Sequence, residues 1–239
     1  MAHSSSEACV AIIPARGGSK GIPLKNLQEV NGRSLVARAV LSAQASGCFS
    51  SVYVSTDLRA IANEASSVGA EVLWRNSALS NDEASTESVL LHHLQVELQD
   101  ISETFALIQC TSPFIGSNAL TQGLSTLASG FQSVFSGIED HVFRWELGPG
   151  GDYIPFGHTR AARPRRQDLP KRVTETGAFY FANTLLFLEE KSRFCGRVGA
   201  VLVDRVDAIE IDSPADLDLA RQLSRAWDEK EQQNANWKH

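Results

Sequence analysis

The sequence predicts a single α/β domain built on a mostly parallel β-sheet with helices on both of its faces. Short apolar runs alternate with stretches in which apolar residues recur every three or four positions, as in strands followed by amphipathic helices. The strand-like runs are apolar almost throughout, which indicates that both faces of the sheet are covered. The 239 residues, 43% hydrophobic and 21% charged, suit one globular domain with a substantial core.

The elements follow one another in a regular order. Strands are expected at residues 9–15, 51–57, 70–74, 104–110, 133–137, 177–183, 197–204 and 208–212. Helices are expected at residues 34–46, 58–69, 84–98, 115–129 and 213–227. The last helix has a clear start, because Ser213 is a good N-cap and Pro214 suits a first turn. The domain is therefore expected to span residues 1–228, with 229–239 as a frayed polar tail.

The alternation breaks after Gln132. Residues 138–170 are polar, punctuated by Gly and Pro, and too long for an ordinary connection. They form either a flexible insertion or an arm that carries binding groups and partner contacts. The stretch also holds more aromatic side chains than a solvated loop should expose, namely Phe143, Trp145, Tyr153 and Phe156. We therefore expect a dimerisation arm and a homodimer or homotetramer with this arm at its interface.

Charge and cysteine usage narrow the class of protein. The net charge of −6 argues against a general nucleic-acid coat or a membrane-surface protein, so neither partner is expected. The four cysteines form no CxxC pair, which favours reduced thiols and a cytoplasmic protein. The basic run Arg163–Arg166 leaves a nuclear location, or a local nucleic-acid patch, open.

The stretch "ARGGSKGIPLKN", Ala15 to Asn26, follows the first expected strand. Ligands of parallel sheets lie beyond the carboxyl ends of the strands, so this loop is well placed to bind one. It matches neither G-x-x-x-x-G-K-[ST] nor G-x-G-x-x-G. Its glycines allow close approach to phosphate oxygens, and Arg16, Lys20 and Lys25 could neutralise a triphosphate. Asn26 has the donor and acceptor that a base edge requires, so the loop is either a nucleotide site or a basic surface turn.

These residues resemble the N-terminal signature of the CMP-sialic acid synthetases (N-acylneuraminate cytidylyltransferases), and more loosely that of the CMP-Kdo synthetases. Further segments resemble the family in order and spacing, closest to its animal branch: "SVYVSTD", "WRNSALSNDEAST", "IQCTSPF", "SVFSGIEDHVFRW", "RPRRQDLP", "ETGAFYFAN" and "IEIDSP". The resemblance covers roughly Val10 to Leu219. It implies a Rossmann-like cytidylyltransferase that converts CTP and a sialic acid into CMP-sialic acid and pyrophosphate, with Mg²⁺ as cofactor.

The resemblance also implies roles for individual residues. The nucleotide site is expected to comprise Arg16, Gly17, Ser19, Lys20, Lys25, Asn26, Arg75 and Ser85. The sugar-acid site is expected to comprise Gln109, Arg144, Arg165, Arg166 and Gln167, with Gln109, Arg165 and Arg166 catalytic, because a forked guanidinium suits the carboxylate of the sugar acid. Ser85 is also a candidate helix N-cap, and "RPRR" a candidate import signal.

Glu210 and Asp212 are the expected metal ligands. They alternate along the expected strand 208–212, so both side chains should lie on one face and suit an oxygen-seeking Mg²⁺. A solvated acidic edge is the alternative. Asp57 is either a third metal contact or a helix N-cap, and His92 and His93 are interpreted as structural.

Three positions depart from the family pattern. Cys110 stands where Pro or Ala is usual, Thr176 where Asn is usual, and Glu210 where Asp is usual. The first change is expected to be harmless, the second could alter a sugar contact, and the third concerns the metal. Two other classes stay open, namely a catalytically silent nucleotide-binding regulator and a nucleic-acid-binding protein that uses "RPRR".

Overall fold

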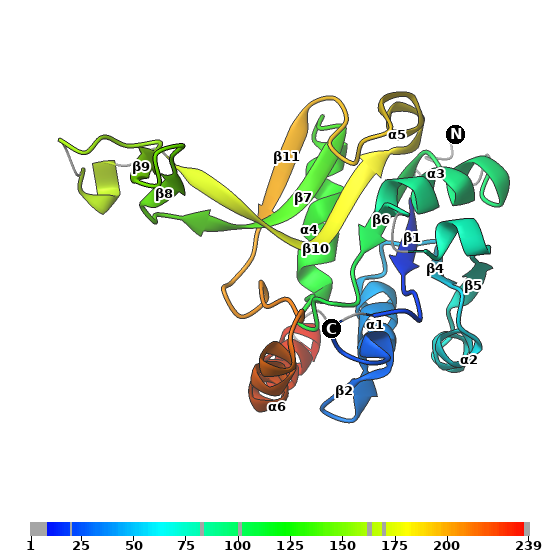
Figure 1. Cartoon of the computed structure of the whole chain (residues 1–239). Helices are drawn as coiled ribbons and strands as arrows, with labels where there is room; N and C mark the ends of the chain where they lie inside the picture. The colour runs from blue at the N-terminus through cyan, green and yellow to red at the C-terminus, as the bar shows by residue number, and fades with distance from the viewer. Residues whose placement is uncertain are drawn as a thin grey trace.

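The computed structural model describes residues 9–19, 21–81, 84–99, 102–161, 164–168 and 171–236. Its centre is a seven-stranded sheet in the order β11-β7-β10-β6-β1-β4-β5 (Figure 1). The strands are β1 (Cys9–Pro14), β4 (Ser51–Thr56), β5 (Glu71–Trp74), β6 (Thr104–Ile108), β7 (Ser133–Asp140), β10 (Arg172–Asn183) and β11 (Val198–Leu202). All neighbours pair in parallel except β10, which is antiparallel to both β6 and β7. The expected mostly parallel sheet is confirmed.

Helices cover both faces of this sheet. In β1, Cys9, Ala11 and Ile13 point into one apolar cluster, whereas Val10 and Ile12 point into the other. The helices on the first face are α1 (Leu35–Ser46), α2 (Arg59–Ser67), α4 (Ser117–Ala128) and α6 (Pro214–Asn236). Those on the second face are α3 (Thr86–Val96) and α5 (Thr184–Glu190). The central strands β1, β4 and β6 are buried almost throughout, so their uninterrupted apolar runs correspond to a Rossmann-like sheet that is covered on both faces.

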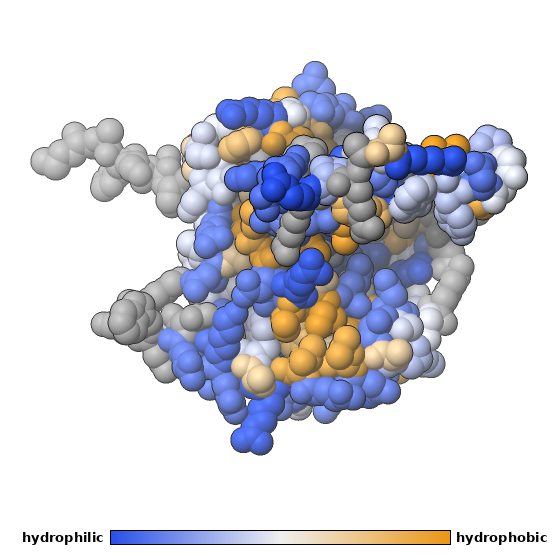
Figure 2. All heavy atoms as spheres, turned by 90° about the vertical axis from the view of Figure 1, so that its left-hand side faces the viewer, coloured by the Kyte–Doolittle hydropathy of each residue, from blue (hydrophilic) through white to orange (hydrophobic). Residues whose placement is uncertain are grey.

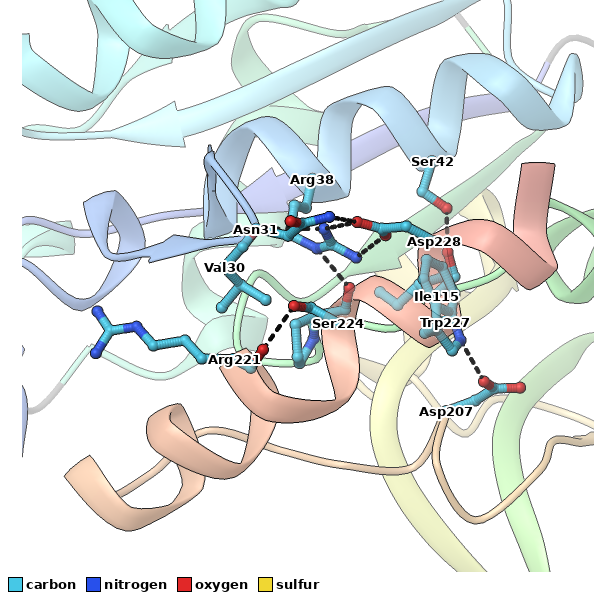
Figure 3. Close-up of polar contacts among 11 residues, drawn as sticks. Val30, Asn31, Arg38, Ser42, Ile115, Asp207, Arg221, Ser224, Trp227 and Asp228 are labelled. Carbon is cyan, nitrogen blue, oxygen red and sulfur yellow. Dashed lines mark hydrogen bonds and ion pairs between the residues drawn. The ribbon is translucent and has the colours of Figure 1, made fainter.

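The C-terminal helix α6 is anchored to the body by a buried arginine. Arg38 of α1 donates from Nη2 to Asp228 Oδ1 (2.7 Å) and from Nε to the carbonyl of Pro113 (2.9 Å). Figure 3 shows Arg38 and Asp228 facing each other between the two helices. The Arg38 guanidinium also lies 5.5 Å from the ring of Trp227, whose Nε1 donates to Asp207 (2.7 Å).

The two ends of α6 can be compared with the helix start and the frayed tail that the sequence predicted. The helix begins at Pro214 as expected, and Asp216 accepts hydrogen bonds from the backbone (2.8 Å) and hydroxyl (2.8 Å) of Ser213. Residues 229–236, expected as a frayed tail, instead continue the helix. Within this segment Glu231 accepts from the backbone N–H of Ser117 at the start of α4 (2.8 Å), which ties the helix to the body.

The expected strand at 208–212 is wrong. Residues 209–212 have no regular secondary structure, and β11 is the last strand of the sheet. The backbone of Ile211 is used otherwise: its N–H donates to the carbonyl of Thr111 (2.8 Å), and its carbonyl accepts from Lys25 Nζ (2.8 Å). The alternating pattern at 208–212 therefore corresponds to a segment whose backbone bonds to loop residues and not to a neighbouring strand.

Residues 138–161 and 164–168 belong to an arm that projects from the sheet (Figure 1). The outer ends of β7 and β10 pair as an antiparallel ribbon, with Arg172 opposite Asp140 and Glu175 opposite Gly137. At its far end lies a second antiparallel pair, β8 (Arg144–Leu147) and β9 (Tyr153–Phe156).

The short elements complete the description. They are η1 (Lys25–Leu27), β2 (Glu29–Val30), β3 (Arg33–Ser34), η2 (Ser77–Leu79) and η3 (Arg166–Asp168). No helix among the described residues has the length and apolar character needed to cross a membrane.

Candidate active site

A cavity of about 440 Å³ opens at the carboxyl edge of the parallel strands. Its walls come from the loop after β1, the residue after β5, the start of α3 and the turn after β6, as expected for ligand sites of open α/β sheets. The predicted residues that line it are Arg16, Ser19, Lys25, Asn26, Arg75, Ser85, Gln109 and Asp212. Residues from distant parts of the chain are thus brought together as the sequence predicted.

The glycine loop after β1 packs tightly against its surroundings. The backbone N–H of Gly17 donates to Asp57 Oδ1 (2.8 Å), so Asp57 holds the loop. The N-cap of α2 is Leu58, which shows that the N-cap alternative for Asp57 is wrong. A Cβ on Gly21 would lie 2.7 Å from the carbonyl of Asp212, closer than contact allows. Glycine at position 21 therefore lets the loop approach the segment before α6.

Lys25 and Asn26 close the floor of the loop. Lys25 Nζ lies 3.2 Å from Asp212 Oδ1 and also binds the backbone carbonyl of Ile211. The Asn26 side chain is buried, and its Nδ2 donates to the carbonyl of Arg16 (3.0 Å). Because a carbonyl oxygen only accepts, this bond fixes which way the amide faces. Among the described residues no hydrogen bond uses Asn26 Oδ1, so the amide oxygen is the group left to a ligand.

Arg75 and Ser85 form the opposite wall. Arg75 Nε donates to the hydroxyl of Ser55 (2.8 Å), and burial lowers the pKa of Arg75 to about 10, which still leaves it a cation at neutral pH. Ser85 lines the cavity and is also the N-cap of α3, where its hydroxyl accepts from the backbone N–H of Ser88 (3.1 Å). The N-cap alternative for Ser85 is therefore correct without excluding a binding role.

Two carboxylates lie beside the cavity. Partial burial and the neighbouring Asp212 both raise the pKa of Glu210, and Thr111 Oγ1 donates to it (3.3 Å). The described residues contain no group of three or more His, Cys, Asp or Glu side chains that could enclose a metal ion. Mg²⁺ is commonly held by one or two carboxylates together with substrate phosphates. A mutually repelling pair next to a polar cavity fits that kind of site.

The predicted arm residues lie away from this cavity. Arg144 binds Asp140 and Thr174 within the arm, and Arg165 Nε binds Asp168 (2.9 Å) with its own side chain 76% exposed. Gln167 is exposed as well. Lys20, Arg163 and the side chain of Arg166 lie outside what the structure describes. Among the described residues, the chain thus gathers most of those predicted to bind the nucleotide, and it holds Arg144 and Arg165, predicted to bind the sugar acid, away from them.

Apolar surface accompanies these arginines. The arm exposes Trp145, Leu147, Tyr153, Ile154 and Phe156 at 44–68%. Figure 2 views the molecule from the side of the arm and shows further apolar side chains gathered on the body beside it.

Two of the unusual positions now have a physical account. Cys110 lines the cavity but is buried, and burial raises the pKa of its thiol to about 12, so the thiol is unreactive. The buried hydroxyl of Thr176 bonds to Ser136 Oγ (2.7 Å), and Thr176 is not among the residues that line the cavity. The wall residues Thr86 and Thr111 were not predicted as site residues. Thr86 directly follows the predicted site residue Ser85, and Thr111 directly follows the expected strand 104–110.

Comparisons with known proteins agree with this geometry. Residues 10–145 match the family model described as Cytidylyltransferase. N-acylneuraminate cytidylyltransferase A of Danio rerio is 39% identical over 180 residues, which are 72% of this chain and 40% of that protein. Pseudaminic acid cytidylyltransferase of Campylobacter jejuni is 29% identical over 221 residues, 90% of this chain and 95% of that protein. The chain spans only 40–50% of the length of the fish N-acylneuraminate cytidylyltransferases that it matches.

A solved structure shares the fold. CMP:2-keto-3-deoxy-manno-octonic acid synthetase complexed with CTP superimposes with a TM-score of 0.68 over 92% of this chain and 99% of that chain, at 16% identity. Together with the cavity and its basic loop, the family match over more than half of the sequence confirms the resemblance. The chain belongs to the cytidylyltransferase family.

Proposed function

We propose that the protein transfers CMP from CTP to a sialic acid and releases pyrophosphate. The observation that carries this proposal is the cavity that gathers Arg16, Lys25, Asn26 and Arg75, four residues from the segments that resemble N-acylneuraminate cytidylyltransferases. Three of them are cations, and a triphosphate is the polyanion that they would neutralise.

The amide of Asn26 supplies the base selectivity. Its Nδ2 is engaged by the carbonyl of Arg16, so its Oδ1 is presented as an acceptor. The N4 amino group of cytosine is a donor at that edge of the base, whereas uracil has an acceptor oxygen there. An acceptor at this point in the cavity favours CTP over UTP.

The transfer step needs positioning and charge neutralisation. The anomeric hydroxyl of the sugar acid attacks the α-phosphorus of CTP in line, the P–O bond to the leaving pyrophosphate breaks, and the hydroxyl proton passes to solvent. Lys25, Arg75 and Gln109 line the cavity. In the proposed step Lys25 and Arg75 neutralise phosphate charge, and Gln109, which follows β6, hydrogen-bonds to the sugar. Glu210 and Asp212 would hold Mg²⁺, with Asp57 as a further candidate. Bound Mg²⁺ would stabilise negative charge on the phosphates.

The arm completes the site in a homo-oligomer. A sugar acid needs cations for its carboxylate, and Arg144, Arg165, Arg166 and Gln167 are the candidates, on an arm that leaves its own cavity. A second copy whose arm reaches this cavity would supply them while covering the exposed aromatics of the arm. Two-fold symmetry then provides two complete sites per dimer.

We further propose a cytoplasmic protein. All four cysteines are free thiols, as expected in a reducing compartment. The basic run that leaves a nuclear location open lies partly outside the described residues, so this alternative stays a prediction.

The test is a turnover assay with CTP, Mg²⁺ and a panel of sugar acids that includes sialic, pseudaminic and Kdo acids. Pyrophosphate release with sialic acids ahead of the other two is the expected result. The similarity to the pseudaminic acid cytidylyltransferase of Campylobacter jejuni makes that sugar the main competitor. CTP binding without any pyrophosphate release would instead indicate a silent nucleotide-binding regulator.

A further inference from the structure

The guanidinium of Arg75 is held at the cavity by a buried hydroxyl. Its Nε donates to Ser55 Oγ over 2.8 Å, and Ser55 is 0% exposed at the end of β4. Nη2 of Arg75 is buried and has no hydrogen-bond partner among the described residues. Within the part of the chain that the structure describes, the orientation of Arg75 therefore depends on the hydroxyl of Ser55.

Ser55 is fixed in turn by a histidine that the proposed reaction does not use. Its Oγ lies 2.6 Å from Nε2 of His93, which reaches the sheet from α3. Nδ1 of His93 contacts the carboxylate of Glu97, one helical turn further along. The His93 side chain is 0% exposed and that of Glu97 is 33% exposed, so the chain of contacts runs from the cavity towards the surface.

Elementary hydrogen-bond chemistry gives this chain a direction. The Nε–H of Arg75 can only donate, so Ser55 accepts there. The carboxylate of Glu97 accepts from Nδ1 of His93, so the proton of a neutral ring lies on Nδ1, and Nε2 is left to accept the hydroxyl proton of Ser55. Burial lowers the pKa of His93 despite the opposing effect of Glu97, and the charge of Arg75 lowers it further, which favours the neutral ring that this arrangement requires.

We propose that His93 and Glu97 are positioning residues of the nucleotide site, which act through Ser55 to hold Arg75 in the orientation that meets a nucleoside triphosphate. The inference rests on the proposed function, because Arg75 is assigned to the nucleotide there. A long side chain fixed before the ligand arrives loses less freedom on binding, and affinity rises accordingly.

The primary test is His93→Phe, which removes both ring nitrogens and keeps a buried aromatic ring. We expect the Kd and KM for CTP to rise roughly tenfold, within the range of coupled neighbours in one hydrogen-bond network. The kcat and the KM for the sugar acid should change little. His93→Gln, which retains an acceptor for Ser55, should recover part of the affinity, and His92→Phe, one residue away on the same helix, is the matched control.

A double-mutant cycle separates positioning from a general structural role. In an Arg75→Ala background, His93→Phe should add almost nothing to the loss of CTP affinity measured by calorimetry. An equal added loss in that background, or unchanged CTP affinity in folded His93→Phe, would overturn the inference. Glu97→Ala and His93→Gln carry the same comparison if His93→Phe does not fold.

Different measurements would contradict the positioning role of His93 and the proposed function. If the parent chain binds CTP but releases no pyrophosphate with any sugar acid, the proposed function is wrong. The cycle of CTP affinities would still decide the role of His93.

Discussion

The lining of the cavity, here called the wall and taken together with the neighbouring Glu210, differs from the arm in how its charged side chains are held. On the wall, Lys25 and Arg75 are fixed by contacts that cross the fold, to the segment before α6 and to Ser55 in β4. In the arm, Arg144 and Arg165 pair with carboxylates of the arm itself and lie in or near solvent. The cations of the wall are therefore oriented by the body of the chain, whereas those of the arm are oriented only by the arm and remain exposed to solvent.

Under the proposed function, this difference divides the two halves of the reaction. The proposed nucleotide site uses groups that one folded chain supplies. The arginines proposed for the sugar acid lie on the arm, away from the cavity of their own chain. Substitutions on the wall should therefore impair the site of the chain that carries them, and substitutions in the arm should impair the site of a neighbour.

The largest effect is expected on the wall, from Glu210→Gln combined with Asp212→Asn. Turnover that depends on Mg²⁺ should be abolished, because the two carboxylates proposed as the main metal ligands become neutral amides. Pyrophosphate release measured over a Mg²⁺ titration checks this, with circular dichroism to verify the fold.

Asp218→Asn, which removes an exposed carboxylate of α6, is the matched control for the double variant. Full activity of the double variant at limiting Mg²⁺ would move the metal site elsewhere. Asp57, which already holds the glycine loop, would then be the first candidate.

The second prediction tests the arm directly. Arg166→Ala should raise the KM for the sugar acid or lower turnover while leaving CTP affinity nearly unchanged, and Lys25→Ala should impair the nucleotide site. Mixed after subunit exchange, the two variants should recover about a quarter of parental activity. Half of the dimers are then mixed, and each mixed dimer has one intact site.

Absence of any recovery in a verified mixed dimer would contradict an arm that acts on its neighbour. Full activity of a monomer at micromolar concentration would contradict the interface itself. Equal losses of CTP and sugar-acid binding in Arg166→Ala would contradict the division between wall and arm.

The sequence was sufficient for most of the fold because the strands are apolar on both faces. Val10 and Ile12 face one core while Ala11 and Ile13 face the other, so an unbroken apolar run was a reliable strand signal. The same signal misled at 208–212. There Ile211 is buried as a strand residue would be, but its backbone bonds to Thr111 and Lys25. Apolar alternation indicates which side chains are buried, but it does not indicate which backbone groups hydrogen-bond to each other.

The candidate site was predictable where its residues directly follow strands. Arg16, Arg75 and Gln109 occupy such positions, and strand ends of a parallel sheet converge. The contact between Ser55 and His93 joins residues 38 positions apart, and from the sequence His93 was interpreted as structural. The direction of the Asn26 amide was equally hidden, because a backbone carbonyl decides it.

The third prediction concerns the contact that Asn26 is proposed to make with the base of the nucleotide. Asn26→Ala should reduce the preference for CTP over UTP by about 1–3 kcal/mol, the usual value of a good side-chain contact to a base edge. Competition binding with both nucleotides measures it. Gln28→Ala, two residues along the chain, removes an amide that does not line the cavity and serves as control. An unchanged preference in Asn26→Ala would end the assignment of Asn26 to the base.

The smallest effect concerns stability, for which body and arm should again differ. Burial raises the pKa of Asp228, but hydrogen bonds from Arg38 and Asn31 outweigh it and hold that pKa below its ordinary value. Asp228→Asn leaves Arg38 buried without its anion, and we expect a loss of about 3 kcal/mol in the free energy of unfolding at pH 7. The exposed pair of Arg160 and Asp152 in the arm is the control, and Asp152→Asn should cost less than about 1 kcal/mol.

The pH dependence of the Asp228 effect gives a second measurement. A carboxylate whose pKa is depressed by folding contributes stability above its unfolded pKa and loses it as the pH falls through the folded value. Urea titrations from pH 7 into the acid range should therefore show the parent and Asp228→Asn converging as the pH falls through the lowered pKa of Asp228, because the parent carboxylate becomes protonated there. If the two aspartate variants lose the same stability at pH 7, α6 is not anchored by this pair, and the body is no better fixed than the arm.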